Sequence, residues 1–226
     1  MSAPGFGPSL RLFPDGVAVA YTDDAVTPPA LPREEVAAVA NAVEARQKEF
    51  ALGRWCARRA LAQLGVTAET IPVGPDRAPR WPSEFVGSIT HCKGFVGAVV
   101  APVHRLRSIG FDAERADALA PDLISSICTS RELEWISHRA VSPFVDWPKI
   151  IFSAKEAVHK CISPLSGRML DFLDVTLTID DTTMAFTVSE ARPGASQGAD
   201  LSSVRGQIAH DERFVFTCAF VDSSLS

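Results

Sequence analysis

Two carboxylates alternate with apolar residues along 109–114, which read IGFDAE. If this segment is a β-strand, its period of two puts Asp112 and Glu114 on one face, opposite Ile109, Phe111 and Ala113. Two adjacent carboxylates repel each other unless a cation lies between them, and an all-oxygen pair suits Mg²⁺. The alternative is that they belong to the solvated polar face of an edge strand.

A further acid and base follow in residues 152–160, which read FSAKEAVHK. At about 100° per residue, a helix here would carry an apolar stripe made of Ile151, Ala154, Val158, Cys161 and Ile162. Glu156 and Lys160 would then project together from roughly the opposite side. They could serve a reaction, or they could form an ordinary exposed i,i+4 pair worth a few tenths of a kcal/mol.

Basic side chains precede both segments. A helical region carries Arg46, Arg54, Arg58 and Arg59, a loop carries Arg77, and residues 88–91 read SITH. Because Arg54 and Arg58 are one turn apart and Arg46 falls within about 80° of Arg54, all three could face one ligand. Arginine forks match phosphate groups well, so a phosphate site is one interpretation, and a solvated helix face is the other. A lone histidine such as His91 is more often structural than catalytic.

The composition limits the function classes. A chain of 226 residues with 46% hydrophobic residues can bury a substantial core, and a net charge of −5 argues against a non-specific nucleic-acid binder. Five scattered cysteines without CxxC spacing predict neither a disulfide framework nor a zinc site. We see no signal peptide and no apolar run of about 20 residues, so we expect a cytoplasmic protein without membrane attachment.

The elements that must position these residues follow from periodicity and from helix breakers. We expect strands at 17–21, 85–90, 95–101, 108–114, 172–179, 184–188 and 214–221. We expect helices at 34–64, as two helices stopped by Gly65, and at 122–128, 131–138 and 147–162. Residues 71–82 read as an ordered, proline-rich loop, and 190–211 as a mobile polar loop. This order predicts an α+β fold.

Together these segments resemble the Sfp-type 4'-phosphopantetheinyl transferase family, in particular actinobacterial-looking members of broad carrier-protein specificity. The resemblance runs over most of the chain and is carried by 48–61 (KEFALGRWCARRAL), 81–82 (WP), 87–92 (GSITHC), 110–114 (GFDAE) and 152–160 (FSAKEAVHK). It implies a pseudo-twofold pair of similar α/β subdomains with the active site in the cleft between them. The first, 1–105, would mainly bind coenzyme A, and the second, 106–226, would bind metal and catalyse.

The resemblance also implies the reaction: the 4'-phosphopantetheine group of coenzyme A passes to a serine of an apo acyl or peptidyl carrier protein, releasing adenosine 3',5'-bisphosphate. Asp112, Glu114 and Glu156 would bind Mg²⁺, or Mn²⁺, with Ala113 contributing its backbone carbonyl. Glu156 would be the general base and Lys160 would stabilise the transferring group. The coenzyme A contacts would be Arg46, Arg54, Asp76, Arg77, Thr90, His91, Lys155, Glu156 and Lys160. Asp76-Arg77 departs from the basic residue and glycine that relatives often carry.

We expect a monomer whose partners are coenzyme A and carrier protein domains, not nucleic acid or a membrane. Because carrier proteins of this class are acidic, the mixed basic and aromatic region 129–149 is a docking hypothesis. It contains Arg131, His138, Arg139, Phe144 and Trp147. Two other functions stay open. One is a Mg²⁺-dependent phosphohydrolase acting on coenzyme A-like substrates, and the other is a non-catalytic coenzyme A binding or scaffold protein.

Overall fold

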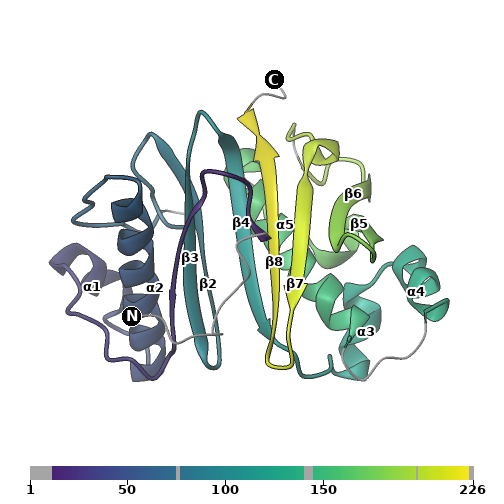
Figure 1. Cartoon of the computed structure of the whole chain (residues 1–226), viewed down its shortest axis with the longest axis horizontal. Helices are drawn as coiled ribbons and strands as arrows, with labels where there is room; N and C mark the ends of the chain where they lie inside the picture. Colours follow the sequence, from purple (N-terminus) through teal and green to yellow (C-terminus); the bar gives the residue numbers. More distant parts are fainter. Residues whose placement is uncertain (1–11, 75–76, 140–144, 197, 224–226) are drawn as a thin grey trace.

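The structure, a computed structural model, describes residues 12–74, 77–139, 145–196 and 198–223. The described chain forms two antiparallel sheets side by side, each packed against one long helix (Figure 1). The chain passes from the first sheet to the second between Pro102 and Leu106. The division into 1–105 and 106–226 stays a prediction.

The first half consists of β1 (Ala18–Thr22), α1 (Arg33–Val39), α2 (Glu44–Gln63), β2 (Phe85–Cys92) and β3 (Phe95–Pro102). Its sheet has the order β1-β3-β2. The predicted two helices are confirmed, and Gly65 follows α2 with a φ of +79°, a conformation that glycine adopts without steric cost. The predicted hairpin is also confirmed, since β2 and β3 pair from Phe85 opposite Pro102 to Cys92 opposite Phe95.

The second half begins with β4 (Leu106–Arg115) and three helices, α3 (Pro121–Ile127), α4 (Ser130–Ser137) and α5 (Trp147–Ser166). It continues with β5 (Val175–Asp180), β6 (Ala185–Ala191), β7 (Arg205–His210) and β8 (Phe214–Asp222). The sheet order is β4-β8-β7-β6-β5. At the start of α5 the Asp146 side chain accepts the Lys149 N–H at 2.7 Å, which fixes where the helix begins.

The two halves repeat one plan. In each half the first strand pairs with the last (β1 with β3, β4 with β8), and the last strand pairs with the one before it (β2 with β3, β7 with β8). In each half the 20-residue helix lies between these strands in the chain and packs on the sheet. This arrangement confirms the predicted α+β fold, in which two similar halves of one chain each pair a sheet with a helix.

One prediction for this region is wrong. Residues 205–210 were expected to lie in a mobile loop, but they form β7 between β6 and β8. The strand carries few bulky apolar residues because Gly206 lies against Phe186, whose ring would be 2.1 Å from an added Cβ. The alternation of buried Gly206 and Ile208 with less buried neighbours was therefore too weak a signal.

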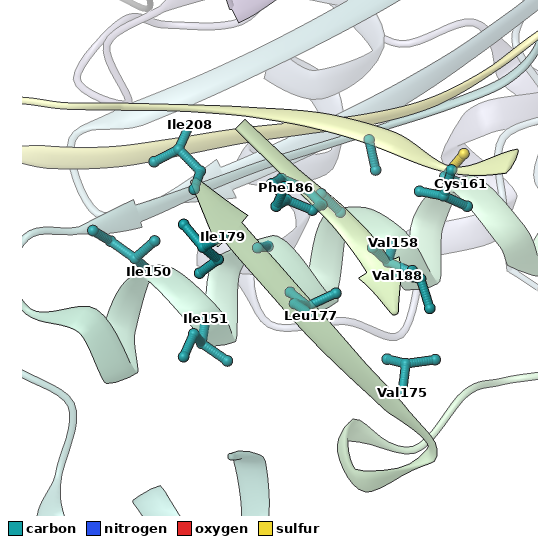
Figure 2. Close-up of a cluster of buried hydrophobic side chains, with 14 of the residues drawn as sticks. Ile150, Ile151, Val158, Cys161, Val175, Leu177, Ile179, Phe186, Val188 and Ile208 are labelled. Carbon is teal, nitrogen blue, oxygen red and sulfur yellow. The ribbon is translucent and has the colours of Figure 1, made fainter. Parts of the chain in front are cut away.

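Three apolar clusters hold the elements together. One lies between α2 and the first sheet, and a second lies between α5 and the second sheet, where Figure 2 shows Ile151 and Val158 of α5 in the same cluster as Leu177 of β5. The third joins both sheets through aromatic rings, with Phe95 of β3 at 4.9 Å from Phe216 of β8 between ring centroids. This shared cluster fixes the first sheet against the second.

None of the helices in the described ranges is both long enough and apolar enough to cross a bilayer. All five cysteines are free thiols, and Cys56, Cys128, Cys161 and Cys218 are buried. Burial alone raises the pKa of the Cys161 thiol to about 12. The four buried cysteines therefore serve as apolar core residues rather than reactive groups.

Gly110 allows α5 to approach β4 closely. A Cβ built on Gly110 would lie 1.9 Å from the Ala157 carbonyl oxygen and 2.6 Å from the Cys161 nitrogen, and both are backbone atoms that cannot rotate away. The face of β4 that carries Asp112 is therefore covered by a helix rather than by solvent. The close approach also sets how far Glu156 and Lys160 stand from that strand.

We expect Gly110→Ala to lower the free energy of unfolding by about 3 kcal/mol, the upper part of the range for overpacking, because neither backbone can yield. Urea unfolding followed by circular dichroism measures this. Gly65→Ala is the control, since nothing lies within 4 Å of its added Cβ and only left-handed strain of about 1 kcal/mol applies. Equal urea midpoints for the two variants would contradict the packing argument.

Candidate active site

The two sheets meet where β2 lies beside β4, and the Thr90 hydroxyl lies at this joint. It accepts the Ala113 backbone N–H at 3.1 Å and donates to Asp112 Oδ1 at 3.2 Å. Two residues earlier, the Ser88 hydroxyl donates to the Phe111 carbonyl at 3.5 Å. The end of β2 is thereby held beside the acidic segment of β4.

Asp112 is only 4% exposed, so it does not belong to a solvated edge. Lys160 Nζ donates to Asp112 Oδ1 at 2.6 Å, and Ser153 Oγ donates to Oδ2 at 2.8 Å. A buried carboxylate requires such partners because its desolvation is costly. Lys160 thus reaches across to β4, which distinguishes it from the exposed base of an ordinary i,i+4 helix pair.

Glu114 and Glu156 share the electrostatic environment of Asp112. Burial, aided by the negative charge of Asp112, raises the pKa of Glu114 to about 7. Burial also raises the pKa of Glu156, with Lys160 opposing and Asp112 reinforcing the shift. Within the described ranges, no three His, Cys, Asp or Glu side chains are gathered closely enough to hold a metal ion as they stand.

A pocket of about 220 Å³ opens beside the acidic residues. Both halves contribute to it, and its lining is Arg46, Glu49, Phe50, Gly53, Arg54, Arg77, Pro79, Ile89, Thr90, His91 and Lys160. Four of these side chains are basic at neutral pH: Arg46, Arg54, Arg77 and Lys160. In a chain of net charge −5, this is a locally basic cavity.

His91, near the end of β2, lies between Arg46 and Glu49 in the lining of the pocket. Arg46 Nη1 is 2.7 Å from His91 Nε2, and because a guanidinium only donates, Nε2 accepts. The ring proton then lies on Nδ1, which is 3.7 Å from Glu49 Oε2. Burial lowers the pKa of His91, which favours this neutral form.

Arg54 is the most buried cation of the pocket. Its Nε donates to the Ile71 carbonyl at 2.8 Å, and its guanidinium lies over the Phe50 ring, 4.5 Å from the centroid. Burial lowers the pKa of Arg54 to about 10, and Glu35 opposes this shift. The side chain therefore stays charged at neutral pH, with its two Nη groups as further donors.

The prediction that Lys155 contacts a ligand phosphate is wrong. Its side chain is 1% exposed, its Nζ lies 2.8 Å from Glu132 Oε2, and it does not line the pocket. It also donates to the carbonyls of Ile127 and Phe172 at 2.8 and 2.7 Å. Lys155 is one residue from Glu156, but helical periodicity turns neighbouring side chains about 100° apart.

Arg58 does not join Arg46 and Arg54 at the pocket, although helical spacing allowed all three to face one ligand. Arg58 Nη1 donates to both oxygens of Glu35, at 2.8 and 2.9 Å, because Glu35 is fully buried and needs a cation. Arg46, Arg54 and Arg77 do line one pocket. Asp76 lies outside the described residues.

In the described part of 129–149, the proposed docking residues differ in their surroundings. Arg139 pairs with Asp181 at 3.1 Å and lies over the Trp135 ring, and Arg131 pairs with Glu190. His138 is exposed, Trp147 packs partly against the core, and Phe144 lies outside the described residues. The hypothesis stays a prediction.

Sequence reasoning missed two side chains that support Asp112. Ser153 and Thr217 are both fully buried, and their hydroxyl oxygens are 2.9 Å apart, next to Asp112 Oδ2. The sequence did contain a sign of this role for Ser153: its hydroxyl lies close to the apolar face of the predicted helix, where a buried polar group needs a hydrogen-bond partner. The sequence has no comparable signal for Thr217, which bonds Ser153 and lies opposite Asp112 in the pairing of β8 with β4.

Comparison with known proteins gives a consistent picture. The family described as 4'-phosphopantetheinyl transferase N-terminal domain matches residues 34–101, and the 4'-phosphopantetheinyl transferase superfamily matches residues 108–217. The 4'-phosphopantetheinyl transferase Svp of Streptomyces mobaraensis is 40% identical over 83% of this chain and 77% of its own. The 4'-phosphopantetheinyl transferase PptT of Mycobacterium tuberculosis is 36% identical over 88% and 90%.

We expect Glu114→Gln to stabilise the protein at pH 8 by on the order of 2 kcal/mol, in buffer with a chelator. A carboxyl whose folded pKa of about 7 exceeds its unfolded value destabilises the folded state once ionised. This penalty is largely absent at pH 5, grows as the pH rises toward 7 and is complete at pH 8.

Urea unfolding at pH 5 and pH 8 measures the change. Glu134→Gln, at an exposed position on α4, is the control and should match the wild-type chain at both pH values. If the Glu114→Gln variant and the wild-type chain show the same pH dependence, the ionisation of Glu114 does not affect folding as described.

Proposed function

The chain belongs to the 4'-phosphopantetheinyl transferase superfamily. From this membership we propose that the pocket is where the 4'-phosphopantetheine group passes from coenzyme A to a serine of a carrier protein. The proposal rests above all on Lys160. This side chain lines the basic pocket and also donates to Asp112 at 2.6 Å. A phosphate held in the pocket would therefore lie next to the acidic residues.

The pocket suits the phosphates of coenzyme A. Arg46, Arg54 and Arg77 offer charge-assisted donors from α2 and from the segment after it, while His91 contributes from β2. The Thr90 hydroxyl is already bonded to Asp112 and Ala113, so a contact of Thr90 to the ligand would use other atoms of that residue. The first half would thus supply most of the grip on coenzyme A.

Asp112, Glu114 and Glu156 would hold a Mg²⁺ or Mn²⁺ ion, with the Ala113 carbonyl as a further ligand. The donor types fit, since all three are carboxylates and hard divalent cations favour oxygen ligands. Burial, reinforced by the charge of Asp112, raises the pKa of Glu114 and Glu156, and a bound cation would offset this cost of ionisation. When bound, such an ion polarises a phosphate oxygen and offsets negative charge on it. Lys160 would have to share Asp112 with the ion.

Glu156 is the proposed general base. Burial raises its pKa, which brings its proton affinity closer to what proton abstraction near neutral pH requires. It would accept the proton from the acceptor serine hydroxyl as that oxygen attacks the β-phosphate. Lys160, one turn later on α5, would stabilise the charge that develops on the transferring group. Adenosine 3',5'-bisphosphate would leave.

The acceptor would be an acyl or peptidyl carrier protein, and the enzyme would work as a cytoplasmic monomer. The free cysteines agree with a reducing compartment. The chemistry by itself would also allow a phosphohydrolase, in which water takes the place of the serine. A single assay separates the two reactions.

In that assay the chain is incubated with coenzyme A and Mg²⁺, with and without an apo carrier protein. We expect mass spectrometry to show one phosphopantetheine group added to the carrier protein, and adenosine bisphosphate to appear only when the carrier protein is present. A carrier protein with its acceptor serine changed to alanine is the control. Release of adenosine bisphosphate without any acceptor would support the hydrolase instead.

We expect Glu156→Gln to lower kcat for transfer by about 10²- to 10⁴-fold, because the amide cannot take the serine proton. Its urea midpoint should not fall below that of the wild-type chain, since Glu156 belongs to none of the apolar clusters and its burial disfavours the charged form that Gln removes. Glu134→Gln again serves as the matched control. A Glu156→Gln variant with wild-type kcat would favour a non-catalytic role for these carboxylates.

A further inference from the structure

Glu35 on α1 is a fully buried carboxylate that the proposed chemistry does not use. Arg58 Nη1 donates to both of its oxygens, and the Ile71 backbone N–H donates to its Oε1 at 2.7 Å. These partners meet the needs of a buried charge. They also tie three separate parts of the first half to one side chain: α1, α2 and the segment that follows α2.

Ile71 connects this carboxylate to the basic pocket. Its N–H donates to Glu35, and its carbonyl accepts Arg54 Nε at 2.8 Å. One fully buried residue is therefore held on both sides of its backbone. Since Arg54 lines the pocket, the place where its guanidinium is anchored depends on where Glu35 holds Ile71.

The same tether fixes the base of the segment that carries Arg77. The Arg80 N–H donates to the Pro72 carbonyl at 2.8 Å, and Val73 bridges Pro79 in antiparallel fashion. Arg77 and Pro79 line the pocket beyond this base. Glu35 is thus connected through Ile71 and its chain neighbours to the segments that carry two of the pocket's arginines, although it does not line the pocket itself.

The second half contains a matching arrangement. Glu132 on α4 is 2% exposed, pairs with Lys155 of α5 and accepts the Leu177 N–H at 2.8 Å. In both halves a buried glutamate on a short helix holds a cation of the long helix and a backbone N–H of the next segment. Each long helix carries residues of the site, which points to a shared role in holding those residues in place.

We propose that the Glu35 side chain positions the phosphate grip through its hydrogen bond to the Ile71 N–H, and thereby acts on Arg54 and Arg77, while Arg58 offsets the buried charge of Glu35. This inference rests on the proposed function in one respect, that the pocket takes the phosphates of coenzyme A. Loss of the tether would weaken ligand binding while the acidic residues of the second half remain in place. A merely structural pair would instead lower stability and leave ligand affinity unchanged.

Two double variants isolate the tether. Glu35→Met/Arg58→Met replaces the ion pair by apolar groups of similar volume, a change that is often neutral for stability, and it leaves the Ile71 N–H without an acceptor. Glu35→Gln/Arg58→Met also lacks the ion pair but keeps an amide oxygen for that N–H. Arg46→Met, at the pocket itself, is the positive control for weaker binding.

We expect Glu35→Met/Arg58→Met to raise KM for coenzyme A and the calorimetric Kd for adenosine 3',5'-bisphosphate about tenfold, the effect of one charge-assisted hydrogen bond. Its kcat should stay within about twofold of the wild-type value. Glu35→Gln/Arg58→Met should show KM and Kd values close to those of the wild-type chain, because its amide oxygen still accepts the Ile71 N–H. Unchanged KM and Kd in the Met/Met variant, or equal increases in both double variants, would refute the proposal.

Hydrogen exchange on the wild-type chain gives a second measurement that does not depend on a variant folding. Saturating adenosine bisphosphate should slow exchange of the Ile71 amide about tenfold, because ligand binding and the tether stabilise each other. Unchanged exchange at Ile71 would count against the tether. If the wild-type chain bound the ligand but transferred nothing, the proposed function would fail while the binding comparison still tested Glu35.

Discussion

The ion pair between Asp112 and Lys160 is the interaction on which the site depends. Asp112 comes from β4 and Lys160 from α5, and Thr90 of β2 donates to the same carboxylate oxygen at 3.2 Å. Because a buried carboxylate must keep its partners, these contacts hold three elements from both halves at one point. The basic pocket and the acidic residues adjoin for this reason, since Lys160 belongs to both.

Close packing makes this contact possible. α5 can lie against β4 only because position 110 has no side chain, and the register of α5 then determines which side chains reach the strand. Ser153 and Lys160 donate to Asp112, whereas Lys155, only two residues after Ser153, pairs with Glu132 of α4. Thr217 supports Ser153 from β8, so the acidic site is held by sheet pairing as well as by the helix.

The two halves use one architecture for different chemistry. Each packs a 20-residue helix on an antiparallel sheet, and each fixes that helix through a buried glutamate, Glu35 or Glu132. The first half presents arginines to the pocket, whereas the second contributes Lys160 to it and carries Asp112, to which Lys160 donates. Opposite charges from the two halves thus face the joint between β2 and β4, where an anionic ligand and a cation could be held side by side.

The sequence by itself determined the fold class, nearly every element and the residue types of the site, because the signals for these are local. They are the alternation at Asp112 and Glu114, the helical spacing of Glu156 and Lys160, and helix breakers such as Gly65. It could not separate Lys155 from Lys160 or Arg58 from Arg54, since both members of each pair are basic residues on the same helix. It also missed β7, whose small residues reflect the Phe186 ring beside them. Only the tertiary structure decided these points, because burial and partners such as Glu132 and Glu35 come from segments distant in the chain.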